Sequence, residues 1–321
     1  METIEKLLKD GNQALQNGDL SVAAQIYQSA LEQDADNASA HNNLGFVLGQ
    51  QQQWPEATTH LRTALRLDPQ MSMAHCNLGQ VLVATGDAQE GLEHLQKAVD
   101  CDPNNVTAWD NLARIRVLVG DYQAGEYAAT RALKLQPNSA HLLTRLGISV
   151  AAQKRLPEAL QCYQQAITID RNYSEAWAQV GITHFLHNDL GSASEALEIA
   201  INLSPNDTNA LRHLALIHLS MGKPDEAIAH FERLLTLQPD DDASRLDLAV
   251  IFLSAQKAKT ALEQLELIRG SFRESSKFLF YQGLALQQNG QREEGKELLQ
   301  NLADQHNDDY AEKARKMLQI H

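Results

Sequence analysis

A small residue recurs every 34 positions along almost the whole chain. Two helices can approach closely only where their side chains are absent or no larger than a methyl group. The recurrence therefore predicts one close helix crossing in each of nine 34-residue repeats. The first column of small residues contains Gly11, Gly45, Gly79, Ala113, Gly147, Gly181, Ala215, Ala249 and Gly283. A second column lies twelve residues further on and contains Ala23, Ala57, Gly91, Gly125, Ala159, Ala193, Ala227, Ala261 and Gly295.

Turn signals lie between the two columns and at the end of each repeat. Glycine between the columns permits the left-handed conformation that ends a helix, and a later proline stops the second helix. We therefore expect each repeat to be helix, tight turn, helix and a second turn. The first signals are Gly18-Asp19, Gly86-Asp87, Gly120-Asp121, Gly222-Lys223 and Gly290-Gln291, and the prolines are Pro69, Pro103, Pro137, Pro205 and Pro239.

The register predicts an all-α fold, a single solenoid over residues 1–321. Arg273 replaces the proline of the eighth repeat, so we expect a local kink there. After the ninth repeat, Tyr310, Ala314, Met317 and Leu318 follow helical spacing and predict a capping helix over 310–320, with Asn307 or Asp308 as its N-cap. The expected repeats are 4–37, 38–71, 72–105, 106–139, 140–173, 174–207, 208–241, 242–275 and 276–309.

Charge and cysteine content narrow the possible partners and compartment. A formal net charge of −14 argues against binding nucleic acid or anionic membrane surfaces, because both reward lysine and arginine. Cys76, Cys101 and Cys162 have neither a pairing nor a metal-ligand spacing, which favours a reducing compartment. No apolar run is long enough to span a bilayer and no secretory signal is present, so we expect a cytoplasmic protein without direct membrane insertion.

The columns resemble the tetratricopeptide repeat, a 34-residue pattern of Trp, Leu, Gly, Tyr, Ala, Phe, Ala and Pro. Repeat 6 shows the likeness well, with Trp177, Gly181, Ala193, Ala200 and Pro205. The resemblance covers residues 4–309. It implies a right-handed superhelix whose first helices line a concave wall, and it implies that this wall holds protein ligands.

Three asparagines follow one another at the sixth position of consecutive repeats: Asn43, Asn77 and Asn111. An amide offers both a donor and an acceptor, so such a ladder can bind the backbone of an extended peptide. It is similar to the asparagine ladder in the repeats of O-linked N-acetylglucosamine transferase. The alternative is that these amides only stabilise turns or bind water. If the ladder binds a peptide, changing Asn77 and Asn111 to alanine weakens binding without lowering thermal stability.

Two further parts of the expected wall are candidate contacts. Repeats that clamp the carboxylate tail of heat-shock chaperones need a lysine pair that this chain lacks, which argues against a co-chaperone. Arg114 and Arg145 remain able to bind one carboxylate, although arginines at such positions are commonly just solvated. Phe185, Leu186 and Leu219 form the apolar part of the expected wall, where an amphipathic helix or another copy of the chain can dock.

The chain lacks recognisable catalytic motifs, so we expect no enzyme activity and no cofactor. His184, His187 and His218 have spacings that metal ligands can adopt, but no cysteine or carboxylate completes a site, and we expect packed side chains and no metal. The favoured function is a protein-binding scaffold or adaptor. The alternatives are a self-assembling homo-oligomer, which light scattering distinguishes, and a regulatory subunit of an enzyme complex, for example one like the glycosyltransferase above. The expected capping helix argues against the latter, because a longer chain would not need it.

Overall fold

The computed structural model describes residues 3–319, and every regular element in that range is helical. The first helices of the nine pairs begin at the 34-residue interval that the sequence predicts. They are α1 (Ile4–Gln16), α3 (Ala38–Gln50), α5 (Ser72–Ala84), α7 (Val106–Leu118), α9 (Ala140–Ala152), α11 (Ser174–Leu186), α13 (Thr208–Ser220), α15 (Asp242–Ser254) and α17 (Ser276–Gln288). The second helices are α2 (Leu20–Gln33), α4 (Trp54–Leu67), α6 (Ala88–Cys101), α8 (Tyr122–Leu135), α10 (Leu156–Ile169), α12 (Leu190–Leu203), α14 (Pro224–Leu237), α16 (Ala258–Leu267) and α18 (Arg292–Gln305).

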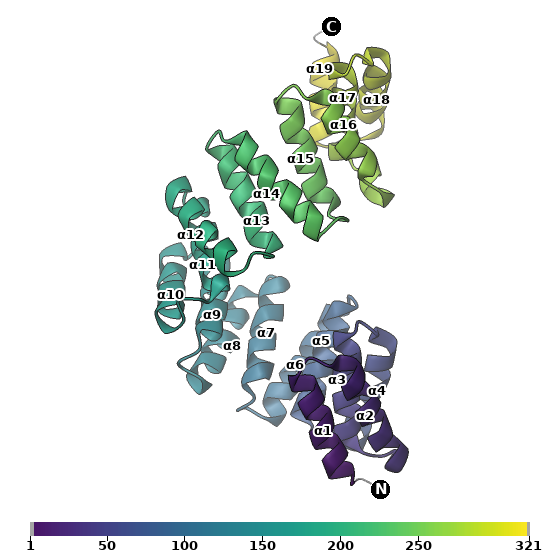
Figure 1. Cartoon of the computed structure of the whole chain (residues 1–321), viewed down its shortest axis with the longest axis vertical. Helices are drawn as coiled ribbons and strands as arrows, with labels where there is room; N and C mark the ends of the chain where they lie inside the picture. Colours follow the sequence, from purple (N-terminus) through teal and green to yellow (C-terminus); the bar gives the residue numbers. More distant parts are fainter. Residues whose placement is uncertain (1–2, 320–321) are drawn as a thin grey trace. The chain divides into compact units, whose positions relative to one another are not determined.

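The chain divides into two compact units, an N-terminal unit of residues 1–176 and a C-terminal unit of residues 177–321. Within each unit, consecutive helices pack as hairpins and each hairpin packs on the next (Figure 1). This arrangement is an α-solenoid of helix-turn-helix repeats. Two features expected from the sequence, a single continuous domain and a right-handed superhelix, depend on how the two units are joined. Both stay predictions.

The two columns of small residues meet where the helices of a hairpin cross. A Cβ atom built on Gly79 of α5 would lie 2.8 Å from the carbonyl oxygen of Gly91 in α6 and 2.8 Å from Cγ of Leu95. A Cβ on Gly147 would lie 2.3 Å from Cε1 of Tyr163. All three separations are shorter than van der Waals contact, so the helices approach closely because these side chains are absent. The close crossing predicted from the sequence is present. Gly45 and Gly181 make the same kind of approach, to Leu61 and Leu197.

The turn inside each hairpin has one residue with a left-handed backbone. Five of these residues are glycines, as predicted: Gly18, Gly86, Gly120, Gly222 and Gly290. In the other repeats the same position has a side chain and keeps a positive φ of 59–64°: Gln52, Lys154, Asn188 and Gln256. The position therefore imposes its geometry whatever the residue. Non-glycine residues rarely adopt this conformation, so these four turns store strain.

The turn between repeats contains the prolines and ends in an N-cap. Pro69, Pro103, Pro137, Pro205 and Pro239 each lie two residues beyond the end of a second helix. The last residue of most repeats then accepts a hydrogen bond from the backbone of the next first helix, for example Asn105 from the amide of Ala108 at 3.0 Å. A side-chain oxygen at this position satisfies one of the otherwise unpaired amides at the helix start. Each inter-repeat turn therefore ends one helix and begins the next.

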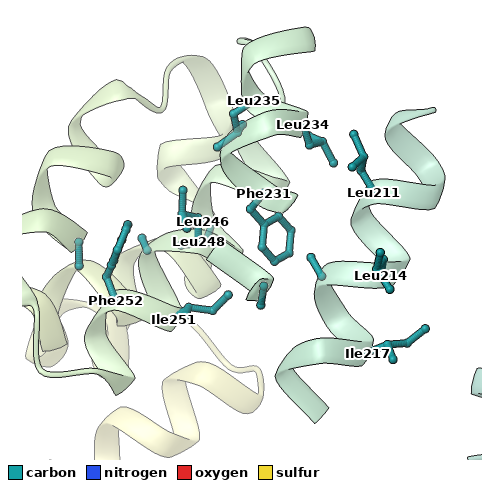
Figure 2. Close-up of a cluster of buried hydrophobic side chains, with 14 of the residues drawn as sticks. Leu211, Leu214, Ile217, Phe231, Leu234, Leu235, Leu246, Leu248, Ile251 and Phe252 are labelled. Atoms are coloured by element: carbon teal, nitrogen blue, oxygen red, sulfur yellow. The ribbon is translucent and has the colours of Figure 1, made fainter. Parts of the chain in front are cut away.

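The core is built from layers shared by neighbouring hairpins. In the C-terminal unit, Phe231 of α14 is fully buried and points toward α13, where Leu211 and Leu214 lie (Figure 2). Leu246 and Ile251 of α15 belong to the same cluster (Figure 2). Each layer therefore depends on the next repeat for its burial, as expected for helices too short to be stable alone.

Repeat 8 and the C-terminal end depart from the regular pattern. Helix α16 stops at Leu267 and is followed by a 3₁₀ helix η1 (Gly270–Glu274), which contains the Arg273 that replaces proline; the kink expected there stays a prediction. Helix α19 (Asp309–Gln319) follows α18. Asp308 caps it by accepting from the amide of Ala311 at 3.0 Å. Met317 and Leu318 are partly buried against the last hairpin, so α19 covers it as predicted. Residue 320, the last of the predicted helix, lies outside the described residues.

Candidate functional site

The first helices of the N-terminal unit lie side by side: α3 contacts α5, α5 contacts α7, and α7 contacts α9. We call the surface formed by their side chains that face away from the second helices the first-helix wall. The fifth and sixth residues of each first helix lie at its centre. Neighbouring repeats therefore bring polar side chains together there in a regular order.

A hydrogen bond joins the fifth residue of one repeat to the sixth residue of the next at three successive steps. Nδ2 of Asn77 donates to Oδ1 of Asn42 at 2.9 Å. Nδ2 of Asn111 donates to Sγ of Cys76 at 3.4 Å. The third step, between Nε of Arg145 and Oδ1 of Asp110, measures 2.9 Å. These bonds between repeats hold the wall in register. They connect partners 35 positions apart, which is one repeat plus one residue.

The bonds change the interpretation of the predicted asparagine ladder. Asn77 and Asn111 are buried, with only 5% and 9% of their surface exposed, and each uses its amide nitrogen within the chain. Asn43 is half-buried and donates to Asn12 at 3.3 Å. Peptide binding by this ladder stays a prediction. The expectation that replacing Asn77 and Asn111 leaves stability unchanged no longer follows, because both side chains join repeats.

A hollow of about 310 Å³ opens on the wall beside Asn77. Its lining includes three kinds of side chain besides aliphatic residues. Phe46 and Trp54 are aromatic, Asn77 and Gln80 are amides, and Arg114 is a cation. These are the groups that anchor a side chain, hydrogen-bond a backbone and pair with a carboxylate.

Arg114 and Arg145 differ in whether their guanidinium groups are free to bind a partner's carboxylate. Arg145 is mostly buried and paired with Asp110. Arg114 is exposed and forms no ion pair with any residue in the described range. Partial burial and the nearby charge of Arg145 lower the pKa of Arg114, while Asp110 opposes this shift. The two arginines were predicted to share one carboxylate, and only Arg114 is unpaired.

A second set of polar side chains continues the wall from α7 to the start of α11. Nε2 of His141 lies 2.8 Å from Oδ2 of Asp110, and Nδ1 of His141 lies 3.0 Å from the Tyr173 hydroxyl. That hydroxyl donates to Oε2 of Glu175 at 2.6 Å. The hydrogen bond to Asp110 raises the pKa of His141 against the opposing effect of burial. Burial tends to raise the pKa of Asp110, but His141 and Arg145 outweigh it and lower that pKa.

Sequence reasoning missed the fifth position of the first helix and the Tyr173 cluster. The predicted asparagine ladder used the sixth position alone, whereas Asn42, Cys76 and Asp110 at the fifth position are the partners that fix the sixth-position side chains. Comparing residues 35 positions apart in the sequence, rather than 34, brings these hydrogen-bonded pairs together. Trp54, at the start of a second helix, also lines the hollow, and no 34-residue column points to it.

The predicted apolar contacts lie in the C-terminal unit. Phe185 is half-buried and packs against the core of this unit. Leu186 and Leu219 are exposed at 63% and 40% of their surface. Phe185 thus acts at least partly in packing, while Leu186 and Leu219 remain open to contact. Their role in binding a partner stays a prediction.

Two of the histidines considered as metal ligands contact polar side chains of their own unit. Nδ1 of His184 lies 3.3 Å from Oδ2 of Asp189, and the buried His218 contacts Ser194 through Nε2 at 3.2 Å. His187 is exposed. Across residues 3–319, no three histidine, cysteine or acidic side chains are grouped so that they can hold a metal ion. Nor does any helix in the same range have the length and apolar character to cross a membrane.

Comparison with protein families agrees with this geometry. Models described as tetratricopeptide repeat match residues 47–106, 111–174, 94–127, 218–278 and 278–308, and one described as TPR repeat matches 11–52. A model described as the CABIN1 N-terminal domain matches residues 146–246. Among the curated proteins no match was found.

Solved structures show the same fold at low sequence identity. A tetratricopeptide repeat protein from Parabacteroides merdae aligns over 78% of this chain and 98% of its own, with 15% identity and a TM-score of 0.65. A chain of the APC/C heterotetramer Cut9-Hcn1 aligns with 18% identity and a TM-score of 0.61, over 72% of this chain and 47% of its own. The present chain thus spans about half the length of that relative. A thermophilic repeat protein from Thermus thermophilus aligns over 57% of this chain and 99% of its own, with 23% identity and a TM-score of 0.53. Repeat register, helix boundaries and family matches agree, and the chain belongs to the tetratricopeptide repeat family.

Proposed function

We propose that this protein is a non-catalytic, cytoplasmic scaffold that binds an extended segment of a partner protein along the first-helix wall of the N-terminal unit. The observation that carries the proposal is the hollow beside Asn77, which joins aromatic, amide and unpaired cationic groups at one place. The three cysteines are free thiols, which fits a reducing compartment.

Each kind of side chain has a separate task in this proposal. Phe46 and Trp54 supply apolar surface for one side chain of the partner, which provides most of the anchoring energy. Gln80 is half-buried and faces the hollow, where its amide can bond the partner's backbone. Asn77 is held by Asn42, so it presents a fixed rather than a mobile amide to the same space. A fixed amide loses little freedom on binding.

Arg114 makes an acidic group the best-fitting feature of the partner. Its guanidinium is partly desolvated, and the nearby carboxylate of Asp110 is already paired with Arg145. A carboxylate of the partner can form charge-assisted hydrogen bonds with it, which are stronger than bonds between neutral groups. The chain as a whole has a formal charge of −14, so most of its surface repels an acidic partner. The positive charge of Arg114 therefore favours binding of that partner at the hollow.

Selection from a displayed library of random peptides tests the proposal. Peptides retained by the wild type are measured again with Arg114→Ala, Gln80→Ala and the control Lys134→Ala, which changes an exposed lysine on α8. We expect acidic residues in the retained peptides and a loss of about tenfold or more in affinity for Arg114→Ala, the usual effect of losing a charged hydrogen bond. Lys134→Ala should bind as the wild type does.

The choice of variant follows from the bonds between repeats. Asn77→Ala removes a bond that joins two repeats, so weaker binding by that variant would not separate contact from folding. Arg114 has no such bond. If no peptide is retained, or if Arg114→Ala binds retained peptides with unchanged affinity, the proposed site is wrong.

A further inference from the structure

His141 is the centre of a chain of hydrogen bonds that crosses three repeats. Asp110 belongs to repeat 4, His141 and Tyr173 to repeat 5, and Glu175 to repeat 6, and all four lie within the N-terminal unit. The three contacts measure 2.8, 3.0 and 2.6 Å. Each is within hydrogen-bond range, so each needs one proton between its two heavy atoms.

Counting those protons fixes the state of His141. Ionised Asp110 has no proton, so Nε2 of His141 must be the donor to it. The single proton of Tyr173 serves the contact with Glu175, because an ionised Glu175 has none to give. The Tyr173 oxygen can therefore only accept from Nδ1 of His141. Both ring nitrogens carry protons, and the ring is an imidazolium.

We propose that His141 makes the first-helix wall pH-sensitive: its imidazolium completes the chain of hydrogen bonds across repeats 4, 5 and 6 and adds a positive charge to the wall, so anionic partners bind more tightly in mildly acidic than in alkaline solution. The tie between repeats stands on the hydrogen bonds alone. The effect on binding rests on the proposed function described above.

The groups around His141 decide the direction of the effect. His141 faces Asp110 of α7, and Arg114 lies one turn further along that helix. Arg145 lies on α9, the helix of His141 itself, and Glu175 belongs to α11. The two carboxylates favour the charged ring, whereas Arg145 and burial oppose it, and the net result is a raised pKa. The charged ring with its full set of hydrogen bonds is therefore fully present below the ordinary histidine pKa and is lost as pH rises through the raised value.

Loss of the second proton leaves the chain of bonds one proton short. Neutral His141 keeps its bond to Asp110, and Tyr173 must then choose between Nδ1 and Glu175. The wall loses one positive charge at the same step. Glu175 then faces the Tyr173 hydroxyl without the neighbouring cation.

The first experiment is an NMR titration of the imidazole signals in the free, full-length protein, with His141 assigned by His141→Gln. We expect a pKa above the reference value of 6.5 in the wild type. Tyr173→Phe removes the acceptor that requires the second proton, so the pKa of His141 should fall. Glu175→Gln should lower it as well, because the tyrosine proton is then free to turn to Nδ1. This second variant keeps the test valid if Tyr173→Phe fails to fold. A pKa at or below 6.5, or one that neither variant changes, overturns the proton count.

The second experiment measures binding of one library-selected acidic peptide at increasing pH. From about pH 6 to about pH 8.5 we expect the wild-type dissociation constant to rise roughly three- to tenfold, the effect of one partly screened charge. His141→Gln should show no such rise, whereas the control His187→Gln, an exposed histidine in the other unit, should keep it. Flat wild-type binding over this range overturns the effect on binding. If no peptide binds at any pH, the proposed function fails, and the titration still decides whether the tie exists.

Discussion

The close crossing of α5 and α6 gives a sharp test of the packing described above. At Gly79 a methyl group would meet the Gly91 carbonyl oxygen at 2.8 Å and the Leu95 side chain at 2.8 Å. Ordinary contact begins near 3.4 Å, and the carbonyl belongs to a helix that cannot rotate away. Gly79→Ala therefore has to separate α5 from α6.

The expected magnitude combines two opposing effects. Overpacking against backbone costs about 3 kcal/mol, at the upper end of the usual range. Replacing glycine by alanine inside a helix returns about 1 kcal/mol. We expect Gly79→Ala to lower the free energy of unfolding by about 2 kcal/mol, measured by urea denaturation followed by circular dichroism.

Gly191 in α12 provides the matched control. The atom nearest to a Cβ built on Gly191 is Oδ1 of Asp189, 3.9 Å away, so a methyl group fits there without a clash. Gly191→Ala keeps the favourable helix effect without the clash and should leave stability unchanged or raise it by up to about 1 kcal/mol. If Gly79→Ala proves as stable as the wild type, close approach does not explain the column of small residues.

Three other predictions follow from local features. Lys154→Gly should raise the free energy of unfolding by about 0.5–1 kcal/mol, because it relieves a left-handed φ of 64°; lower stability in urea denaturation would contradict this. His75 and His94 share a 2.8 Å contact between their Nδ1 atoms, and burial lowers the pKa of both, so the unfolded chain binds their protons more readily and thermal stability should fall as pH drops below about 6.5. His94→Gln should reduce that acid sensitivity, and an unchanged pH profile would refute the reasoning. Asn77→Ala should lower the free energy of unfolding by about 1–2 kcal/mol, and a double-mutant cycle with Asn42→Ala should show coupling between the two residues. Purely additive effects would show that the bond between them does not stabilise the fold.

The repeat register made most of the fold predictable from sequence. The position of Gly79 in a 34-residue column predicts both its helix and the close approach to Gly91, since a steric requirement restricts which residue types can appear. The turn position was found only where it is glycine. At Lys154 the same backbone conformation is imposed by the neighbouring helices, and no residue type signals it.

The candidate site was less predictable because its geometry depends on contacts between repeats. The sequence located the wall residues Asn77, Asn111 and Arg114. It did not reveal that the first two are buried by bonds to the preceding repeat, because that requires knowing the stagger of adjacent helices. Likewise, the link between His141 and Tyr173 joins a helix to a turn 32 positions later, outside every 34-residue column.

Photo-crosslinking tests the central claim, that a partner segment lies on the first-helix wall of the N-terminal unit. A photoreactive residue is placed at Gln80, which lines the hollow, and in a second protein at Glu93, which is exposed on α6. We expect a selected acidic peptide to crosslink to position 80 and an excess of unlabelled peptide to prevent it. Equal or stronger crosslinking at position 93 would place the partner on another surface and contradict the account.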